Sequence, residues 1–385
     1  MSKYTYEESC SIRDSYKILP FQGVWSWLTG KEIYGRKPLW NSSSIECICW
    51  AISWVIVGLF LTYYSFENLY RVEYLAIYLV GVLFSASGAR YIVATIIHHG
   101  VHQHLFKRSY LNRVICEILS TIFIIQPYDS YKEFHVYEHH GKNFSTLDDK
   151  DLSAIYKLGF TPGKSIKKMY LNLFKVIFNP FLHLTFFIGR IKSNLFNVPT
   201  YRLLMSSIWL ILLSFLCFYN GLLFSIFVIV IPFIFVYQIA SILHLITEHR
   251  WVIRNKNMPV RESHLNNCLS RFCGERCPER VSFINLHTWL IWSLKHIFLH
   301  LPTRMLIVQG SLVCHDWHHR FGGEKRWYLY AQLREIDAKK LNDSGEFNYV
   351  EIWGFKNSLN YVFEELASEA VLCDQESSDL KYRLN

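Results

Sequence analysis

The sequence lacks a paired cysteine framework and an N-terminal secretion signal. Its ten cysteines are scattered through 385 residues, and residues 1–37 are polar and charged, without the apolar core of a signal peptide. These absences argue against a small secreted domain held together by disulfides. We therefore expect the functional face of the protein to lie in a reducing cytoplasm.

Acidic residues are nearly absent from the longest apolar runs, and basic residues are not gathered into one stripe. Hydrophobic residues make up 51% of the chain, which is rich for a soluble protein yet too polar for one buried wholly in lipid. The net charge of +9 comes from Lys and Arg spread through the segments that flank apolar runs. This distribution indicates that the basic residues set the membrane topology and contact anionic lipid. We expect no nucleic-acid partner.

Four apolar runs have about the length needed to cross a bilayer, and they fall into two pairs. Residues 47–64 and 74–97 share a short connector, and residues 203–219 and 222–243 meet at Asn220-Gly221. About 18 residues approach the thickness of a hydrocarbon core of roughly 30 Å. Each pair therefore predicts a transmembrane hairpin. The small residues 85–89 (SASGA) should allow close helix packing, and Pro232 should kink the last helix.

Charge asymmetry orients these hairpins. Lys and Arg are frequent in residues 1–46, whereas the first connector has one Arg against two Glu and the second has none. By the positive-inside rule both termini are cytoplasmic. Two weaker stretches, 114–126 and 171–191, are too short or too interrupted to span, and we interpret them as interfacial or re-entrant helices.

The predicted fold is an all-α integral membrane protein with four transmembrane helices in two hairpins and a cytoplasmic helical cap that holds a histidine-rich di-metal site. Its parts are a cytoplasmic segment 1–46, a hairpin 47–97, a cytoplasmic segment 98–202, a hairpin 203–243 and a cytoplasmic region 244–385.

Histidine clusters occur at four places that this topology puts on one side of the membrane. They are HHGVHQH (98–104), HVYEHH (135–140), HLITEH (244–249) and HDWHH (315–319). His98 and His102 share one helix face. Adjacent histidines such as 139 and 140 cannot face one point from a straight helix, but each could reach a different ion of a two-metal site.

Imidazole binds iron, copper, nickel and zinc, so the histidine count does not identify the metal. Many neutral nitrogen ligands with few carboxylates favour an iron centre. The isolated histidines at 183, 264, 287, 296 and 300 are expected to be ordinary polar residues.

From about residue 74 to residue 321 the chain resembles the membrane fatty-acid desaturase superfamily, which includes related hydroxylases. HHGVH (98–102), HVYEHH (135–140) and HDWHH (315–319) are similar to its three histidine boxes, and ITEH ending at His249 is similar to the histidine that follows its fourth span. The resemblance implies nine metal ligands: His98, His102, His135, His139, His140, His249, His315, His318 and His319.

Other residues near these motifs are candidates for supporting roles. His99, His104, Glu248 and Asp316 could orient a ligating imidazole, and His244 is not expected to be a ligand. Arg90, in GAR ahead of the first box, is a candidate for the substrate tunnel or for a structural ion pair. Phe84, Phe233 and Phe235 are candidates for the tunnel wall.

The resemblance implies a membrane-bound oxidoreductase with two iron ions, which uses O2 and two electrons to desaturate a fatty acyl chain. Hydroxylation and oxidative decarboxylation stay open as alternatives, and the acyl group could be carried by lipid, CoA, a carrier protein or a free acid. A histidine-rich metal transporter is a distant alternative, because transporters place ionisable ligands near the midplane.

The chain has no haem-binding HPGG-like motif and no glycine fingerprint for flavin or nicotinamide. Electrons are therefore expected from a separate donor, such as ferredoxin or cytochrome b5 with a reductase. Arg320, Lys325 and Arg326 could dock an acidic donor. Cys268, Cys273 and Cys277 lack an obvious fourth metal ligand, and their role stays open. We expect a bacterial inner membrane, with the active site in the cytoplasm.

Overall fold

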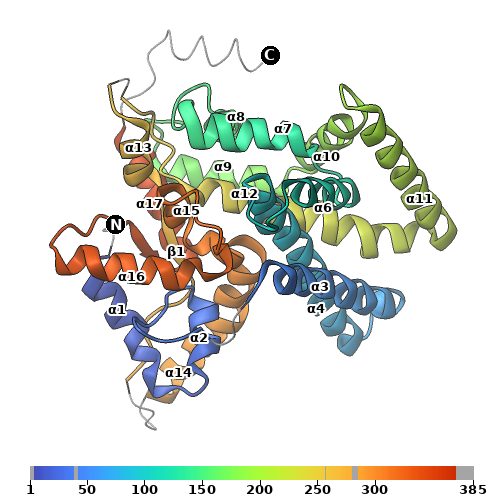
Figure 1. The fold of residues 1–385 in the computed structure, drawn as a ribbon. Coiled ribbons are helices and arrows are strands. Elements are labelled where there is room, and N and C mark those ends of the chain that lie inside the picture. The colour runs from blue at the N-terminus through green and yellow to red at the C-terminus, as the bar shows by residue number, and fades with distance from the viewer. Residues whose placement is uncertain (1–3, 39–41, 256, 280–284, 370–385) are drawn as a thin grey trace.

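The protein is built almost entirely of helices in the computed structural model, which describes residues 4–38, 42–255, 257–279 and 285–369 (Figure 1). Short 3₁₀ and π-helical segments are labelled η. The first half comprises α1 (Tyr6–Ser15), η1 (Tyr16–Ile18), α2 (Gln22–Thr29), α3 (Ser44–Ser65), η2 (Phe66–Asn68), α4 (Val72–Tyr91), η3 (Ile92–Ile97), α5 (His98–Val101), α6 (Ser109–Ile122), α7 (Tyr128–Lys132), η4 (Glu133–Lys142), α8 (Lys150–Lys157), α9 (Ile166–Phe178) and α10 (Pro180–Leu195).

The second half contains the remaining helices and two short strands. They are α11 (Thr200–Phe224), η5 (Ser225–Val236), α12 (Tyr237–Glu248), α13 (Val260–Asn267), β1 (Ser270–Phe272), α14 (Leu286–Lys295), η7 (His296–His300), η8 (Thr303–Ile307), η9 (Gly310–Val313), α15 (His315–Arg320), η10 (Trp327–Leu329), α16 (Tyr330–Asp343), β2 (Glu351–Trp353) and α17 (Phe355–Ser368). The strands pair in parallel, Ser270 beside Glu351.

Within the described residues, three helical stretches are long and apolar enough to cross a membrane, or four if a bent pair of helices counts as one span. The three are Ser44–Asn68, Val72–Val101 and Thr200–Glu248, and the bent pair is α9 with α10, at 64° to each other. All four predicted spans fall inside the three stretches. The longest stretch is interrupted at Gly221, whose φ of 84° and ψ of −179° are not helical, and the chain folds back there (Figure 1). The two-hairpin topology stays a prediction.

The predicted kink at Pro232 coincides with a change of helix type. Pro232 lies inside η5, a π-helical stretch of 12 residues between α11 and α12. A proline removes one backbone donor and crowds the preceding turn, and a wider π turn relieves both effects. The weaker stretch 171–191 falls on the bent pair α9 and α10, where Pro180 begins the second helix.

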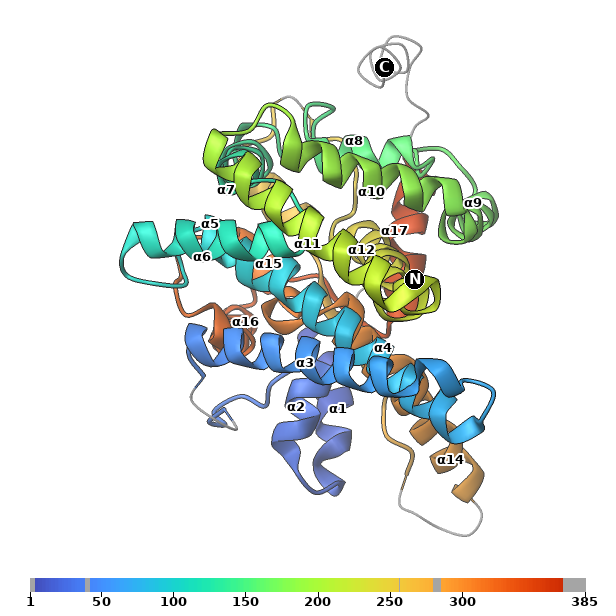
Figure 2. The ribbon, with the colours of Figure 1, turned by 90° about the vertical axis from the view of Figure 1, so that its right-hand side faces the viewer.

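Helices α3 and α4 lie side by side (Figure 2) and approach closely through glycines. A Cβ atom on Gly58 would lie 2.2 Å from the backbone nitrogen of Ser85, and one on Gly88 would lie 2.8 Å from the carbonyl oxygen of Ala51. These contacts confirm the close packing that the small residues 85–89 predict.

Replacing Gly88 with valine should force the two helices apart. Overpacking of a tight contact typically costs about 1–3 kcal/mol, so Gly88→Val should lower the apparent melting temperature of the protein in detergent. Gly189→Val is the matched control, since nothing lies within 4 Å of a Cβ at Gly189. Equal melting temperatures for the two variants would contradict the close approach.

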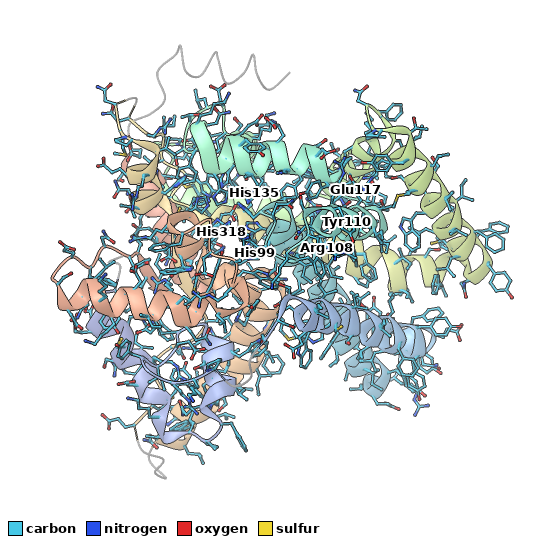
Figure 3. The ribbon with its side chains drawn as sticks, viewed as in Figure 1. His99, Arg108, Tyr110, Glu117, His135 and His318 are labelled. Atoms are coloured by element: carbon cyan, nitrogen blue, oxygen red, sulfur yellow. The ribbon has the colours of Figure 1, made fainter. Side chains whose placement is uncertain are left out.

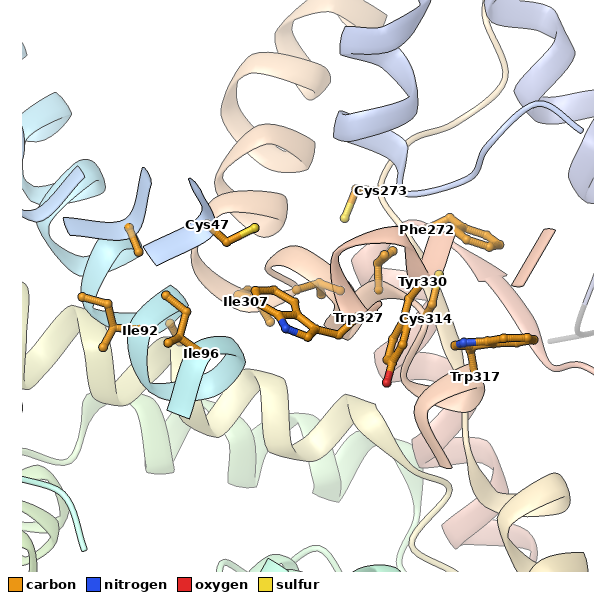
Figure 4. Close-up of a cluster of buried hydrophobic side chains, with 14 of the residues drawn as sticks. Cys47, Ile92, Ile96, Phe272, Cys273, Ile307, Cys314, Trp317, Trp327 and Tyr330 are labelled. Carbon is orange, nitrogen blue, oxygen red and sulfur yellow. The ribbon is translucent and has the colours of Figure 1, made fainter. Parts of the chain in front are cut away.

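A mixed core of apolar side chains and buried ion pairs holds the N-terminal segment against the C-terminal region. Trp327, Tyr330 and Cys314 belong to the apolar part (Figure 4). Lys31 is 1% exposed and forms ion pairs with Glu335 at 2.8 Å and with Glu351 at 3.0 Å. This arrangement fixes the chain immediately after the third histidine box.

Candidate metal centre

Four segments that are far apart in the sequence bring their histidines to one place. The segments are the end of the long helix formed by α4, η3 and α5, the π-helical η4, the residue that follows α12, and the short helix α15. Figure 3 shows His135 of η4 and His318 of α15 together in the centre of the molecule, and their ring centroids are 6.4 Å apart.

The nine histidines named by the family resemblance form two groups, and within each group the ligand atoms lie within 4.8 Å of one another. The first group is His98, His102, His135, His140 and His318, and the second is His139, His249, His315 and His319. His135 and His139 also form a smaller group with Asp151, which connects the two. All nine predicted residues are therefore assembled, and together they offer two adjacent candidate metal positions.

Adjacent histidines divide between the groups. His139 belongs to the second group and His140 to the first, and the same division holds for His319 and His318. This is the arrangement that the sequence suggested for side chains that leave a helix about 100° apart.

The distances between imidazole nitrogens are close to those around a metal ion. Nitrogen ligands at about 2.1 Å from one ion lie roughly 3.0–3.4 Å from each other. Nε2 of His315 lies 3.3 Å from Nε2 of His249 and 3.1 Å from Nε2 of His319, within this range, and the distance of 2.8 Å between Nε2 of His98 and Nε2 of His318 is slightly shorter. The residues therefore suit a pair of ions with imidazole ligands.

Unpaired buried nitrogens point to the same fit. Among the described residues, Nε2 of His102, His135 and His140 has no hydrogen-bond partner. A buried polar atom without a partner is costly, and a bound cation would satisfy all three lone pairs. Burial also lowers the pKa of these three histidines well below the ordinary value, which favours the neutral imidazole that binds metals.

Burial also favours the neutral form of four further histidines. Burial, with the neighbouring imidazoles, lowers the pKa of His249, His315, His318 and His319 well below the usual range. Neutral imidazoles are thus present in both groups.

His139 is the exception, because a carboxylate holds it. Its Nδ1 lies 3.0 and 3.1 Å from the two oxygens of Asp149. Burial lowers the pKa of His139, but the charge and hydrogen bond of Asp149 outweigh this and raise that pKa to about 9. A proton on Nδ1 donated to Asp149 leaves Nε2 free, which is the usual arrangement of a carboxylate behind a ligating histidine.

Asp149 is itself fixed by the backbone. It caps α8 by accepting from the amide of Asp151 at 3.0 Å, and it accepts from the amide of Ser145 at 3.2 Å. The sequence analysis missed Asp149. The sequence did carry a signal for it, because two adjacent acidic residues, Asp148 and Asp149, follow the second histidine box.

Asp316 and Glu248 have different surroundings from each other. Asp316 accepts from Arg334, Ser270 and the amide of Trp317, so it fixes the helix that carries the third box. An oxygen of Glu248 lies 2.9 Å from Nε2 of His244 and 3.7 Å from Nε2 of His315. Glu248 therefore borders the second group directly.

The extra histidines of the first box lie beside the candidate metal groups rather than in them. Nε2 of His99 lies 2.7 Å from Oγ of Ser311, and its ring stacks on Trp327. His104 is buried, with its ring centroid 5.6 Å from that of His102. His244 is also outside both groups, and its Nδ1 donates to the carbonyl of Ile307.

His264 was expected to be ordinary but lies at the edge of the second group. Its ring centroid is 4.9 Å from that of His319, and its Nε2 has no partner among the described residues. Its place depends on the fold of α13, which no motif in the sequence marks. By contrast, His183 and His296 each contact a backbone carbonyl.

The four candidate tunnel residues lie in different places. Arg90 lines a cavity of about 570 Å³ together with His98, His135 and Glu248. Phe84 lines a separate cavity of about 830 Å³. Phe233 packs against Phe123, and Phe235 packs against His183. The lining of these two cavities contains neither residue.

The cysteines at 268, 273 and 277 are buried. Within the described part of the chain, the candidate metal groups contain none of them.

The class of protein follows from this assembly: a helical protein with apolar spans and a histidine-rich site that could hold two metal ions. Residues 74–346 match the family model described as fatty acid desaturase, and the chain belongs to this family. The match supports an oxidoreductase, and with the apolar helices it indicates a membrane protein. A search of curated proteins finds no match.

Removing the carboxylate behind His139 should weaken metal binding. Loss of such a partner typically costs about 10–100-fold in metal affinity, so we expect that loss for Asp149→Ala when Fe²⁺ is titrated without oxygen. Asp149→Asn keeps a hydrogen-bond acceptor and should restore part of the affinity. Asp148→Ala, which removes an exposed neighbouring carboxylate, should bind like the unmodified protein. Identical affinities for all four proteins would contradict the role of Asp149.

Proposed function

We propose that this chain is a membrane-bound di-iron oxidoreductase that desaturates a fatty acyl chain with O2 and two electrons. The observation that carries the proposal is the division of nine histidines, seven of them buried and two half-buried, into two adjacent groups. One ion would have a five-imidazole site and the other a four-imidazole site. The family is generally di-iron, which favours iron among the metals that imidazole binds.

A bound iron pair would supply the oxidising power to break an unactivated C–H bond with O2, which no side chain can supply. In the overall reaction, a –CH2–CH2– unit, O2, two electrons and two protons give –CH=CH– and two water molecules. The chain's own residues contribute position: Asp149 holds His139, and Arg334 with Ser270 holds the helix of the third box through Asp316.

The acyl chain is proposed to lie in the cavity of about 830 Å³ between the spans and the C-terminal region. Trp54 of α3 and Leu83 and Phe84 of α4 line the part formed by the spans. Ser311 and Tyr330 line the same cavity, and they contact His99 and His318. A chain that fills this cavity would therefore run from the spans to the edge of the first histidine group, with Phe84 in its wall.

Arg90 has a structural role in this proposal. Its guanidinium donates to Oγ of Ser241 at 2.9 Å and to the carbonyl of Leu306 at 3.3 Å. These bonds tie α4 to α12 and to η8. They explain how a buried cation is tolerated in the second span.

The electron donor and the membrane location are also part of this proposal. The electron donor would be a separate carrier such as ferredoxin or cytochrome b5 with its reductase. Lys325 is exposed and free to face such a carrier, whereas Arg326 is paired with Glu324 at 2.8 Å. We propose a bacterial inner membrane as the location, with the histidine site and both termini in the cytoplasm.

The function is tested by products formed in cells. Cells that express the protein and receive fatty acids labelled with deuterium should form a labelled acyl chain with one new double bond. His318→Ala removes one imidazole of the first group and should abolish this product, by about 100-fold or more. His287→Ala, which removes an exposed histidine, should leave product formation unchanged.

Other products would change the conclusion. A labelled chain that gains an oxygen, and does so only when His318 is present, would replace desaturation with hydroxylation. A labelled terminal alkene that is one carbon shorter would indicate oxidative decarboxylation. Equal products from the protein and from His318→Ala would contradict a catalytic role for the first group.

A further inference from the structure

The segment formed by α14 and η7 has the polarity of a lipid-facing helix. Its outward side is apolar: Phe298 is 73% exposed and Leu290 is 59% exposed. The exposed apolar residues of this surface, which we call the α14–η7 face, are Leu286, Leu290, Ile291, Leu294, Ile297, Phe298 and Leu299.

The inward side of the same segment carries polar and aromatic groups. Trp292, His296 and His300 are all buried. His296 is held by two hydrogen-bond contacts of 2.8 Å, one to the carbonyl of Trp292 and one to the hydroxyl of Tyr16. A helix on a water-exposed surface places histidine outward and leucine inward. From Leu290 to His300 the order is reversed, with the histidines buried and the leucines exposed, whereas His287 in the first turn of α14 is exposed; water is therefore a poor solvent for most of the outward side.

A contiguous apolar surface of this kind on a soluble face is a liability for aggregation and is normally covered. Helix α16 shows what the aqueous surface of this protein looks like. Its half-buried Lys339 pairs with the exposed Asp343, and Lys340 is also exposed. Ile336 is its one exposed large hydrophobic residue among those described. On α14 and η7 the charged side chain is Lys295, which is exposed and pairs with Glu275 at 2.9 Å, and the exposed side chains around it are mostly apolar.

The same segment adjoins a transmembrane helix. Leu301, directly after η7, and Met305 of η8 line the cavity that Val80 and Phe84 of α4 also line. Phe84 is 14 residues before His98, so it lies about 21 Å from that residue along the helix. Leu79 and Val80 on this part of α4 are themselves exposed. The α14–η7 face therefore continues an apolar surface that belongs to the spans.

The chain on both sides of the segment returns to the histidine site. His264 of α13 packs against His319, and α15 carries the third box. A segment whose two ends lie at the same site cannot cross the bilayer once. It must approach the membrane and return on one side.

We propose that residues 286–305 form a monotopic membrane contact, in which the α14–η7 face lies against the acyl chains of the bilayer beside α4. This contact would hold the C-terminal region on the membrane, over the side of the cavity of about 830 Å³ that Leu301 and Met305 form. The proposal moves these residues from the cytoplasmic region that the sequence predicts to the membrane surface. It is independent of the reaction that the histidine site performs.

Photocrosslinking tests which molecule covers the face. The crosslinking residue p-benzoyl-phenylalanine is incorporated in place of Phe298, and the purified protein is placed in vesicles of phosphatidylethanolamine and phosphatidylglycerol. The same residue in place of Phe215, which is 65% exposed on α11, gives the reference for a span. In place of Ile336, which is 55% exposed on α16, it gives the reference for the aqueous surface.

After irradiation, mass spectrometry should find lipid adducts at position 298 at a level within about twofold of position 215 and about tenfold or more above position 336. Lipid adducts at 215 but not at 298 would overturn the proposal. Crosslinked dimers at 298 in place of lipid adducts would also overturn it, because the occupant would then be a second copy of the chain. Unchanged metal content of the three proteins verifies that each is folded.

Discussion

The structure depends on one electrostatic constraint: nine imidazoles, seven of them buried and two half-buried, bring their ring nitrogens together in two compact groups. Hydrogen bonds cannot satisfy all of these contacts, because Nε2 of His315 faces Nε2 of both His249 and His319, at 3.3 and 3.1 Å, and one ring nitrogen of a neutral imidazole either donates or accepts. Cations bound in the two histidine groups would coordinate these nitrogens, and their binding free energy would stabilise the fold. Four segments of the chain would then be held together mainly by the ions they bind.

Carboxylates and buried ion pairs prepare the site for those ions. Asp149 fixes one imidazole of the second group, and Asp316 fixes the helix of the third box through Arg334. Arg334 also pairs with Glu351 at 2.6 Å, and Glu351 pairs with Lys31 near the N-terminus. Breaking such a buried network leaves an unpaired charge and is strongly destabilising. The N-terminal segment thus supports the histidine site although it contributes no histidine to it.

The sequence predicted the features that depend on local pattern. The apolar runs gave the spans, and the spacing in HVYEHH and HDWHH indicated that neighbouring histidines serve different positions. It could not predict features that depend on tertiary packing. Asp149 and His264 reach the site only through the turn of α8 and the fold of α13. The buried placement of His296 and His300 in η7 depends on how this segment packs, which their isolated positions in the sequence do not show. Phe233 and Phe235 pack against neighbours and line neither cavity.

The most direct test of the account is to count the metal in the purified protein. Cells are grown with ⁵⁷Fe, the protein is purified without chelators, and its metal content is measured together with its Mössbauer spectrum. The account predicts two iron ions per chain, with a spectrum that shows two sites rich in nitrogen ligands. One ion per chain, or zinc in place of iron at both positions, would contradict a di-iron centre built from two histidine groups.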